Sequence, residues 1–249
     1  MARATSCPTR SGSSARQNEF PSSHWLVLLC VLLLACIARA QQDPLQQVLQ
    51  QLDHTAASFD TTQANFVWTQ YTKIVDDTDT QKGTVYFRRS GNQVEMAADI
   101  REPAPPKYVL FTGSKVQVYE TKIDRVSEYD AGKDRAAFES FLVLGFGGSG
   151  RDMLKSFDVK YLGAEEVGGV NASKLELIPK ADRVRGIFAK IWLWIDPARG
   201  LSVQQQFFEP SGDYRLAKYS DIKLNQKIPD SVFKLKTPGD TKYVSSPKG

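Results

Sequence analysis

Apolar and polar residues alternate with a period of two through most of the stretch from residue 61 to residue 224, and this pattern most constrains the fold. Runs around Phe66, Phe87 and Met96 place apolar side chains at every second position, as on one face of a β-strand. Short turns rich in Gly, Pro, Asn and Asp separate the runs, and such turns join antiparallel hairpins. About ten to eleven strands are predicted, and a sheet of that size has to curl strongly or close.

Two stretches have helical periodicity instead. Residues 44–59 carry leucine and valine at spacings of three and four, which predicts an amphipathic helix. Residues 134–144 are strongly apolar on one side, and a short second helix is predicted at residues 152–157. Because strands are predicted on both sides of this helical insert, we expect it to lie within one mostly β domain.

The first 40 residues are predicted to be a secretory signal peptide, followed by one domain over residues 41–249. They contain several arginines, then an apolar run of about 13 residues, too short for the roughly 20 that cross a bilayer. Ala38-Arg39-Ala40 fits the cleavage site. The alternative is that Leu33-Leu34-Ala35-Cys36, which resembles a bacterial lipobox, makes Cys36 a lipidated N-terminus. Both routes export the protein.

Composition argues against several classes of function. The chain has 32 basic and 28 acidic residues, and subtracting the four arginines and one glutamate of the first 40 residues leaves 28 and 27, a net charge of +1. This balance predicts no nucleic-acid partner. All three cysteines lie within the first 40 residues, and the one later histidine, His54, is expected to be a solvated surface residue. We therefore predict no metal site, no catalytic residues and no cofactor.

Residues 145–150 match the Gly-x-Gly-x-x-Gly pattern of dinucleotide-binding proteins. That pattern requires a strand before it, a helix directly after it and a βαβ context. Here a predicted helix precedes it and hairpins follow, so the match is interpreted as incidental. Two interpretations stay open for these glycines: a flexible hinge that lets the apolar helix move, or a simple loop.

Large apolar residues recur along the predicted strands, and an apolar helix is inserted halfway. They form either a cavity for an apolar ligand or an ordinary core. The residues concerned are Phe66, Trp68, Phe87, Met96, Trp192 and Trp194.

The order of motifs resembles that of LolA, the periplasmic outer-membrane lipoprotein carrier family, and of its lipid-binding relatives, over most of the chain after residue 40. The motifs are Phe66-Val67-Trp68-Thr69-Gln70, Gly83-Thr84-Val85-Tyr86-Phe87-Arg88-Arg89, Pro103 followed by Leu110-Phe111-Thr112-Gly113, Leu175-Glu176-Leu177-Ile178-Pro179-Lys180, Leu193-Trp194-Ile195-Asp196-Pro197 with Gly200-Leu201, and Ile228-Pro229-Asp230-Ser231-Val232-Phe233-Lys234-Leu235.

This resemblance implies an incomplete, strongly curved antiparallel β-barrel capped by an N-terminal helix and a central lid helix. It also implies a monomeric periplasmic carrier and not an enzyme. Its apolar cavity would receive the acyl chains of lipoproteins from an inner-membrane ABC-type release complex and deliver them to an outer-membrane receptor. The alternative is a membrane-anchored or soluble envelope-lipid-binding or sensor protein of the same fold.

The resemblance also implies roles for individual residues. The family's lid-locking arginine falls on Arg89, whose alternative is an exposed strand residue. Where carriers often have aromatic pairs, this chain has Val94, Met96, Val116 and Val118, which suggests a cavity shaped for different chains. The expected cavity and lid residues are Phe66, Trp68, Val85, Phe87, Val94, Met96, Val109, Phe111, Phe138, Phe141, Leu142, Trp192 and Trp194.

Overall fold

A computed structural model describes residues 43–91, 93–130 and 144–245 of this chain. They belong to one compact unit, Asp43–Gly249. The predicted signal peptide, Cys36 and the lid residues Phe138, Phe141 and Leu142 lie outside the described residues.

The first described element is helix α2, Pro44–Ser58, which confirms the helix predicted at residues 44–59. Asp43 caps it, because its Oδ1 accepts a hydrogen bond from the N–H of Leu45 at 3.0 Å. Pro44 occupies the first turn, where a missing N–H costs nothing. Val48, Leu49 and Leu52 are buried, so one stripe of the helix packs against the sheet.

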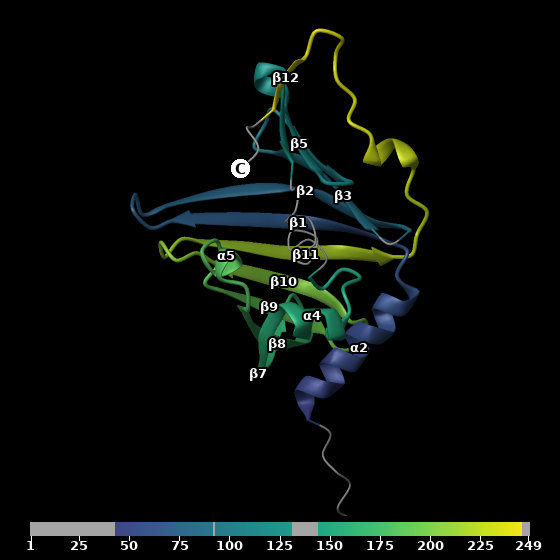
Figure 1. Ribbon diagram of the computed structural model, residues 1–249, viewed down its shortest axis with the longest axis vertical. Coiled ribbons are helices and arrows are strands. Elements are labelled where there is room, and N and C mark those ends of the chain that lie inside the picture. Colours follow the sequence, from purple (N-terminus) through teal and green to yellow (C-terminus); the bar gives the residue numbers. More distant parts are fainter. Residues whose placement is uncertain (1–42, 92, 131–143, 246–249) are drawn as a thin grey trace, which may run out of the picture. The chain divides into compact units, whose positions relative to one another are not determined.

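Within the described residues, twelve strands form a single curved sheet (Figure 1). Its order is β12-β6-β5-β4-β3-β2-β1-β11-β10-β9-β8-β7. The bounds are β1 Thr61–Thr72, β2 Asp77–Ser90, β3 Gln93–Glu102, β4 Lys107–Thr112, β5 Lys115–Glu120, β6 Arg125–Asp130, β7 Phe157–Val167, β8 Val170–Pro179, β9 Lys190–Asp196, β10 Leu201–Phe208, β11 Tyr214–Leu224 and β12 Lys242–Ser245.

The predicted fold class is confirmed: the protein is mostly β, with one large open sheet whose strands β1–β11 pair antiparallel. The strands β7 and β12 are its two edges, so the sheet is not a closed barrel. Strand β12 is the one described strand that the alternation did not predict. It has four exposed residues and pairs parallel with β6, so it carries no apolar periodicity.

The two faces of the sheet are covered by different segments. We call the face that carries Phe87 and Leu193 the inner face, and the face that carries Tyr86 and Trp192 the outer face. Helices α2 and α4, Gly150–Ser156, lie over the inner face at β7–β10 (Figure 1). The segment after β11 crosses the outer face, where the short helix η3, Asp230–Phe233, packs near β3.

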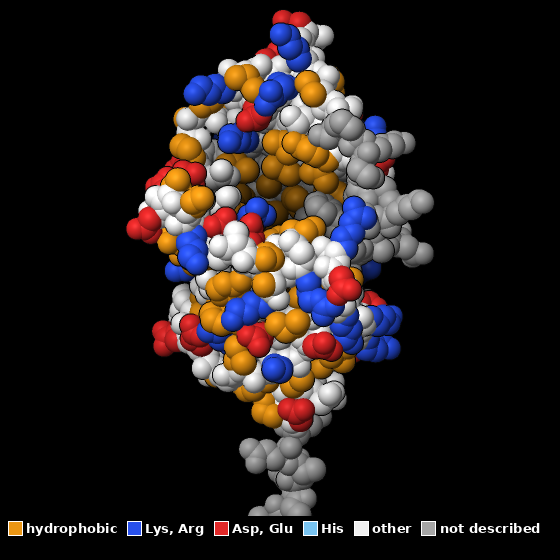
Figure 2. Space-filling view, turned by 60° about the vertical axis from the view of Figure 1, so that its left-hand side comes forward, with side chains coloured by type: hydrophobic (Ala, Val, Ile, Leu, Met, Phe, Trp, Pro, Cys, Tyr) orange, Lys and Arg blue, Asp and Glu red, His pale blue; other side chains and the backbone are white. Residues whose placement is uncertain are grey.

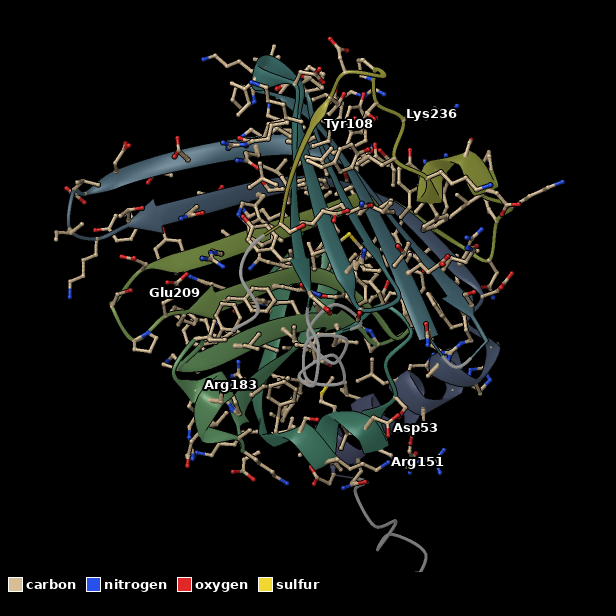
Figure 3. All side chains as sticks on the ribbon, turned by 45° about the horizontal axis from the view of Figure 1, so that its top comes forward. Asp53, Tyr108, Arg151, Arg183, Glu209 and Lys236 are labelled. Atoms are coloured by element: carbon tan, nitrogen blue, oxygen red, sulfur yellow. The ribbon has the colours of Figure 1, made fainter. Side chains whose placement is uncertain are left out.

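Two other short helices connect strands. They are η1, Thr121–Ile123, between β5 and β6, and α5, Asp182–Arg185, between β8 and β9. Helix α4 is joined to α2 by Arg151, whose backbone N–H donates to Asp53 Oδ1 at 3.2 Å and whose Nε lies 3.5 Å from Asp53 Oδ2 (Figure 3). This contact helps to hold the two helices together over the same half of the inner face.

Candidate functional site

The inner face has two halves that are covered to different degrees. Over β7–β10, α2 and α4 pack onto strand side chains such as Leu175 and Leu193, and the core there is filled. Over β1–β3, apolar side chains of the inner face stay half-buried around a smaller buried cluster. In the space-filling view, hydrophobic side chains line a deep hollow (Figure 2). Because its apolar side chains are only half-buried, the half of the inner face formed by β1–β5 is the candidate binding site.

The structure brings eight of the predicted cavity residues together on this half. Cross-strand pairs such as Phe87 with Met96 and Met96 with Phe111 place them side by side on one face. Some are buried and others half-buried, so the face is apolar but incompletely covered. The eight are Phe66, Trp68, Val85, Phe87, Val94, Met96, Val109 and Phe111. Val116 and Val118 extend the same face on β5.

Trp192 and Trp194 are corrections to the predicted site. Both lie on the outer face of β9, whereas Ile191, Leu193 and Ile195 point to the inner core. Trp192 packs on Phe208 with ring centroids 4.7 Å apart. Both sets of side chains in β9 are apolar, so the alternation identifies two faces without telling which of them is the inner one.

Phe146 is a site residue that the sequence analysis missed. Its side chain is fully buried among the apolar residues of β1 and β2, stacked on Phe87 at 4.8 Å and edge-on to Tyr219 at 4.7 Å. It occupies apolar surface that a ligand would otherwise cover. A large apolar residue between two glycines could have indicated that this loop packs on the sheet. The hinge and loop interpretations of the glycines gave Phe146 no role.

Hydrogen bonds to β10 hold the loop that carries Phe146. Gln205 Nε2 donates to the carbonyl of Leu144, and the N–H of Ser202 donates to the carbonyl of Gly145 at 2.9 Å. Tyr219 in turn donates from its hydroxyl to Gln205 Oε1 at 3.1 Å. Burial raises the pKa of Tyr219, so this phenol stays a donor. The loop therefore has a defined place on the sheet.

The glycines of the Gly-x-Gly-x-x-Gly stretch are required by close packing. A Cβ on Gly147 would lie 2.4 Å from the Phe59 ring, and one on Gly150 would lie 2.6 Å from the Leu49 carbonyl oxygen. Gly145 and Gly147 also have positive φ angles of 75° and 87°. The interpretation of the dinucleotide pattern as incidental fits this packed loop between the site and α4.

Arg89 lies on the inner face of β2 and binds three backbone carbonyls. Its Nε donates to Phe59 at 3.1 Å, and its Nη2 donates to Ala56 at 3.3 Å and to Gly147 at 3.2 Å. The guanidinium also lies 5.5 Å from the centroid of the Phe59 ring. Arg89 thus joins the end of α2 to the loop that carries Phe146, while the predicted lid helix lies outside the described residues.

The neighbouring Arg88 points to the outer face and makes a different set of contacts. It pairs with Glu95 at 2.5 Å and with Asp230 at 2.5 Å, and its guanidinium lies 4.2 Å from the Phe233 ring centroid. These contacts hold η3 on the outer face. The pKa of Arg88 is raised by the hydrogen bonds and charges of both carboxylates, which outweigh the effect of its burial.

The residues that the structure describes include one histidine, His54, and no cysteine. Within these residues, no group of three or more His, Cys, Asp or Glu side chains is placed to hold a metal ion, and His54 is exposed on α2. Among the described helices, none combines the length and apolar character needed to span a bilayer.

Comparison with known proteins gives a likeness in fold. No family model matches the sequence, and no curated protein is significantly similar to it. An uncharacterized conserved protein from Thermus thermophilus has a TM-score of 0.52 at 14% identity, over 81% of this chain and 98% of that chain. This match shows that the fold occurs in a solved structure.

Two further solved structures carry descriptive names. A LolA superfamily protein from Nitrosomonas europaea has a TM-score of 0.39 at 17% identity, over 76% of this chain and 97% of that chain. The lipoprotein LppX from Mycobacterium tuberculosis has a TM-score of 0.44 at 13% identity, over 76% and 99%. Both TM-scores are lower than that of the Thermus thermophilus protein.

Proposed function

We propose that this protein is a non-enzymatic carrier that holds acyl chains on the inner face of β1–β5. The observation that carries the proposal is the row of half-buried apolar side chains beside a loop tied down by Arg89. An apolar face that stays partly uncovered in a folded protein favours an apolar ligand. Arg89 is proposed as the residue that locks the loop, and with it the lid.

The cargo is proposed to be the lipid moiety of lipoproteins, moved through the periplasm from an inner-membrane ABC-type release complex to an outer-membrane receptor. The motif resemblance supports this choice. Export would follow from a signal peptide at residues 1–40, ahead of a single monomeric domain over residues 41–249. An anchored or soluble binder of other envelope lipids is the second candidate, because Val94, Met96, Val116 and Val118 leave more room than aromatic pairs.

A carrier has to release its cargo, and the Phe146 loop supplies a competitor. Burying one 16-carbon chain at about 0.8 kcal/mol per methylene gains on the order of 12 kcal/mol, which opposes delivery. If the loop occupies the same surface in the free protein, cargo binding has to displace it. The net affinity is then lowered by the free energy of the closed state.

Two mass-spectrometry experiments test the proposal. Bound molecules are identified after the protein is purified from a bacterial envelope: acylated lipoproteins support the shuttle, phospholipid or glycolipid alone supports the second candidate, and a preparation free of lipid contradicts both. The N-terminus of the natively expressed protein is measured separately. A start near Gln41 supports the soluble carrier, and an acylated Cys36 supports the anchored binder.

A further inference from the structure

A cavity of about 410 Å³ lies on the outer face, on the other side of the sheet from Arg89 and Phe146. Strands β2–β5 form its floor, and residues 231–236 of the segment that crosses this face form its wall. Figure 3 labels one residue from each side, Tyr108 on β4 and Lys236 on the crossing segment. Leu110 and Val232 supply apolar surface, and polar groups surround it.

Three tyrosines line this cavity. Tyr108 and Tyr119 stack with centroids 6.2 Å apart, and the Tyr119 hydroxyl donates to Asp124 Oδ1 at 2.9 Å. The hydroxyls of Tyr86 and Tyr108 have no hydrogen-bond partner among residues 43–91, 93–130 and 144–245. The cavity therefore offers aromatic faces together with two uncommitted hydroxyl groups.

Asp99 supplies an acceptor that the protein leaves unused. Its Oδ2 accepts from Arg101 Nε at 2.9 Å, but its Oδ1 is buried and has no partner in the described part of the chain. A buried carboxylate oxygen without a donor is unfavourable, so a ligand that brings one is favoured. Arg101 also donates from Nη2 to Asp99 Oδ2 at 2.5 Å, and its side chain is 73% exposed against 17% for Asp99, so solvent screens this ion pair and Oδ1 stays without a donor.

Lys234 and Lys236 supply positive charge on the opposite wall. Both are exposed, and neither has an ion-pair partner among the described residues. A ligand that matches this cavity needs an anionic group for the lysines and a hydrogen-bond donor for Asp99. A simple cation would be repelled by the lysines, and a simple anion would leave Asp99 Oδ1 without a donor.

We propose that this cavity binds a zwitterionic group in which a primary ammonium lies a few bonds from a phosphate or carboxylate. The ammonium binds Asp99 and lies against the tyrosine rings, where a cation is attracted to the aromatic face. The anion binds Lys234 and Lys236 and accepts from the free tyrosine hydroxyls. The group comes either from an aminophospholipid headgroup or from a free amino acid, and both are small enough for the cavity.

The test is a titration of the full-length protein with O-phosphoethanolamine, followed by calorimetry and by backbone amide chemical shifts. We expect saturable binding, with shifts at residues of β3, β4 and 231–236, and binding of ethanolamine or inorganic phosphate alone about tenfold weaker or more. Glycerophosphoethanolamine and β-alanine distinguish the two sources. Tighter binding of glycerophosphoethanolamine identifies a lipid headgroup as the ligand, and tighter binding of β-alanine identifies an amino acid.

Variants locate the site. Asp99→Asn and the double variant Lys234→Gln/Lys236→Gln should each weaken binding about tenfold, while Lys218→Gln, an exposed lysine on β11, should not change it. The Asp99 variant and the double lysine variant change opposite sides of the cavity. If one of them fails to fold, the other still tests the site. Absence of saturable binding up to about 10 mM, or equal binding by all variants, would overturn the proposal.

Discussion

Replacing Arg89 with leucine is expected to make the protein hold lipid more tightly and release it more slowly. Of the three hydrogen bonds of Arg89, the one to Gly147 exists only while the loop lies on the sheet, whereas those to Phe59 and Ala56 hold the end of α2. Leucine removes the bond to Gly147, which is present only in the closed, lipid-free state, while the loss of the two bonds to α2 affects the closed and the lipid-bound states alike. The closed state then competes less well with cargo.

The size of the effect follows from the geometry. Hydrogen bonds to charged groups contribute about 1.5–3 kcal/mol each, but they are not additive. The three distances of 3.1–3.3 Å are longer than those of strong charge-assisted bonds, and the arginine is only partly buried. We therefore take about 1.5 kcal/mol for the bond to Gly147, which corresponds to roughly a tenfold increase in lipid affinity.

The assay measures uptake and release separately. Loading is followed with an environment-sensitive fluorescent fatty acid and with inner-membrane vesicles that contain lipoprotein, and release is followed by transfer to receptor-bearing acceptor vesicles. Loading should be at least as good as in the parent protein and transfer clearly slower. A folded variant with affinity unchanged within about twofold, or with equal loss of both steps, would refute the proposed lock.

The control has to avoid Arg88, although it is the adjacent charge. Arg88 holds η3 through Glu95 and Asp230, so its loss would disturb the outer face. Lys82→Leu is the better control, because Lys82 lies on the same strand and its ion pair with Glu102 is exposed at both ends. Its loading and transfer should match those of the parent protein.

Three further changes have defined outcomes. Phe146→Ala should lower the free energy of unfolding in urea by about 3–5 kcal/mol and increase fatty-acid affinity, whereas unchanged affinity would mean that Phe146 does not compete with lipid. Gly147→Ala should destabilise the protein by at least about 1 kcal/mol in the same measurement, because of its positive φ and the Phe59 ring; Gly91→Ala, at a positive φ with open space around it, separates the two causes. The raised pKa of Tyr219 stabilises the fold fully below the ordinary tyrosine pKa of about 10, and this contribution is lost as the pH rises above it. Tyr219→Phe should therefore lessen the fall in stability measured between about pH 9 and 11, and an unchanged fall would contradict this assignment.

The architecture could be predicted well from the sequence because its signals are local. Period-two alternation and hairpin turns indicate strands whatever their neighbours are, and the capped start of α2 is a property of Asp43 and Pro44. Eight of the expected cavity residues share the inner face for the same reason, since paired strands keep the alternation in register. Strand β12 was not predicted, because four exposed residues that pair parallel with β6 carry no alternation of apolar and polar side chains.

The detailed site depends on contacts between distant residues. The sequence alone determined that Trp192 and Trp194 share a face and that residues 145–150 form a glycine-rich stretch. Only the tertiary structure decided that those tryptophans lie on the outer face and that Phe146 lies on the inner face. Hydrogen bonds from Arg89 to Gly147 and from Gln205 to Leu144, across 58 and 61 residues, fix the loop that carries Phe146. Local periodicity shows which side chains lie on the same face of a strand, whereas long-range packing decides whether that face lies against the core.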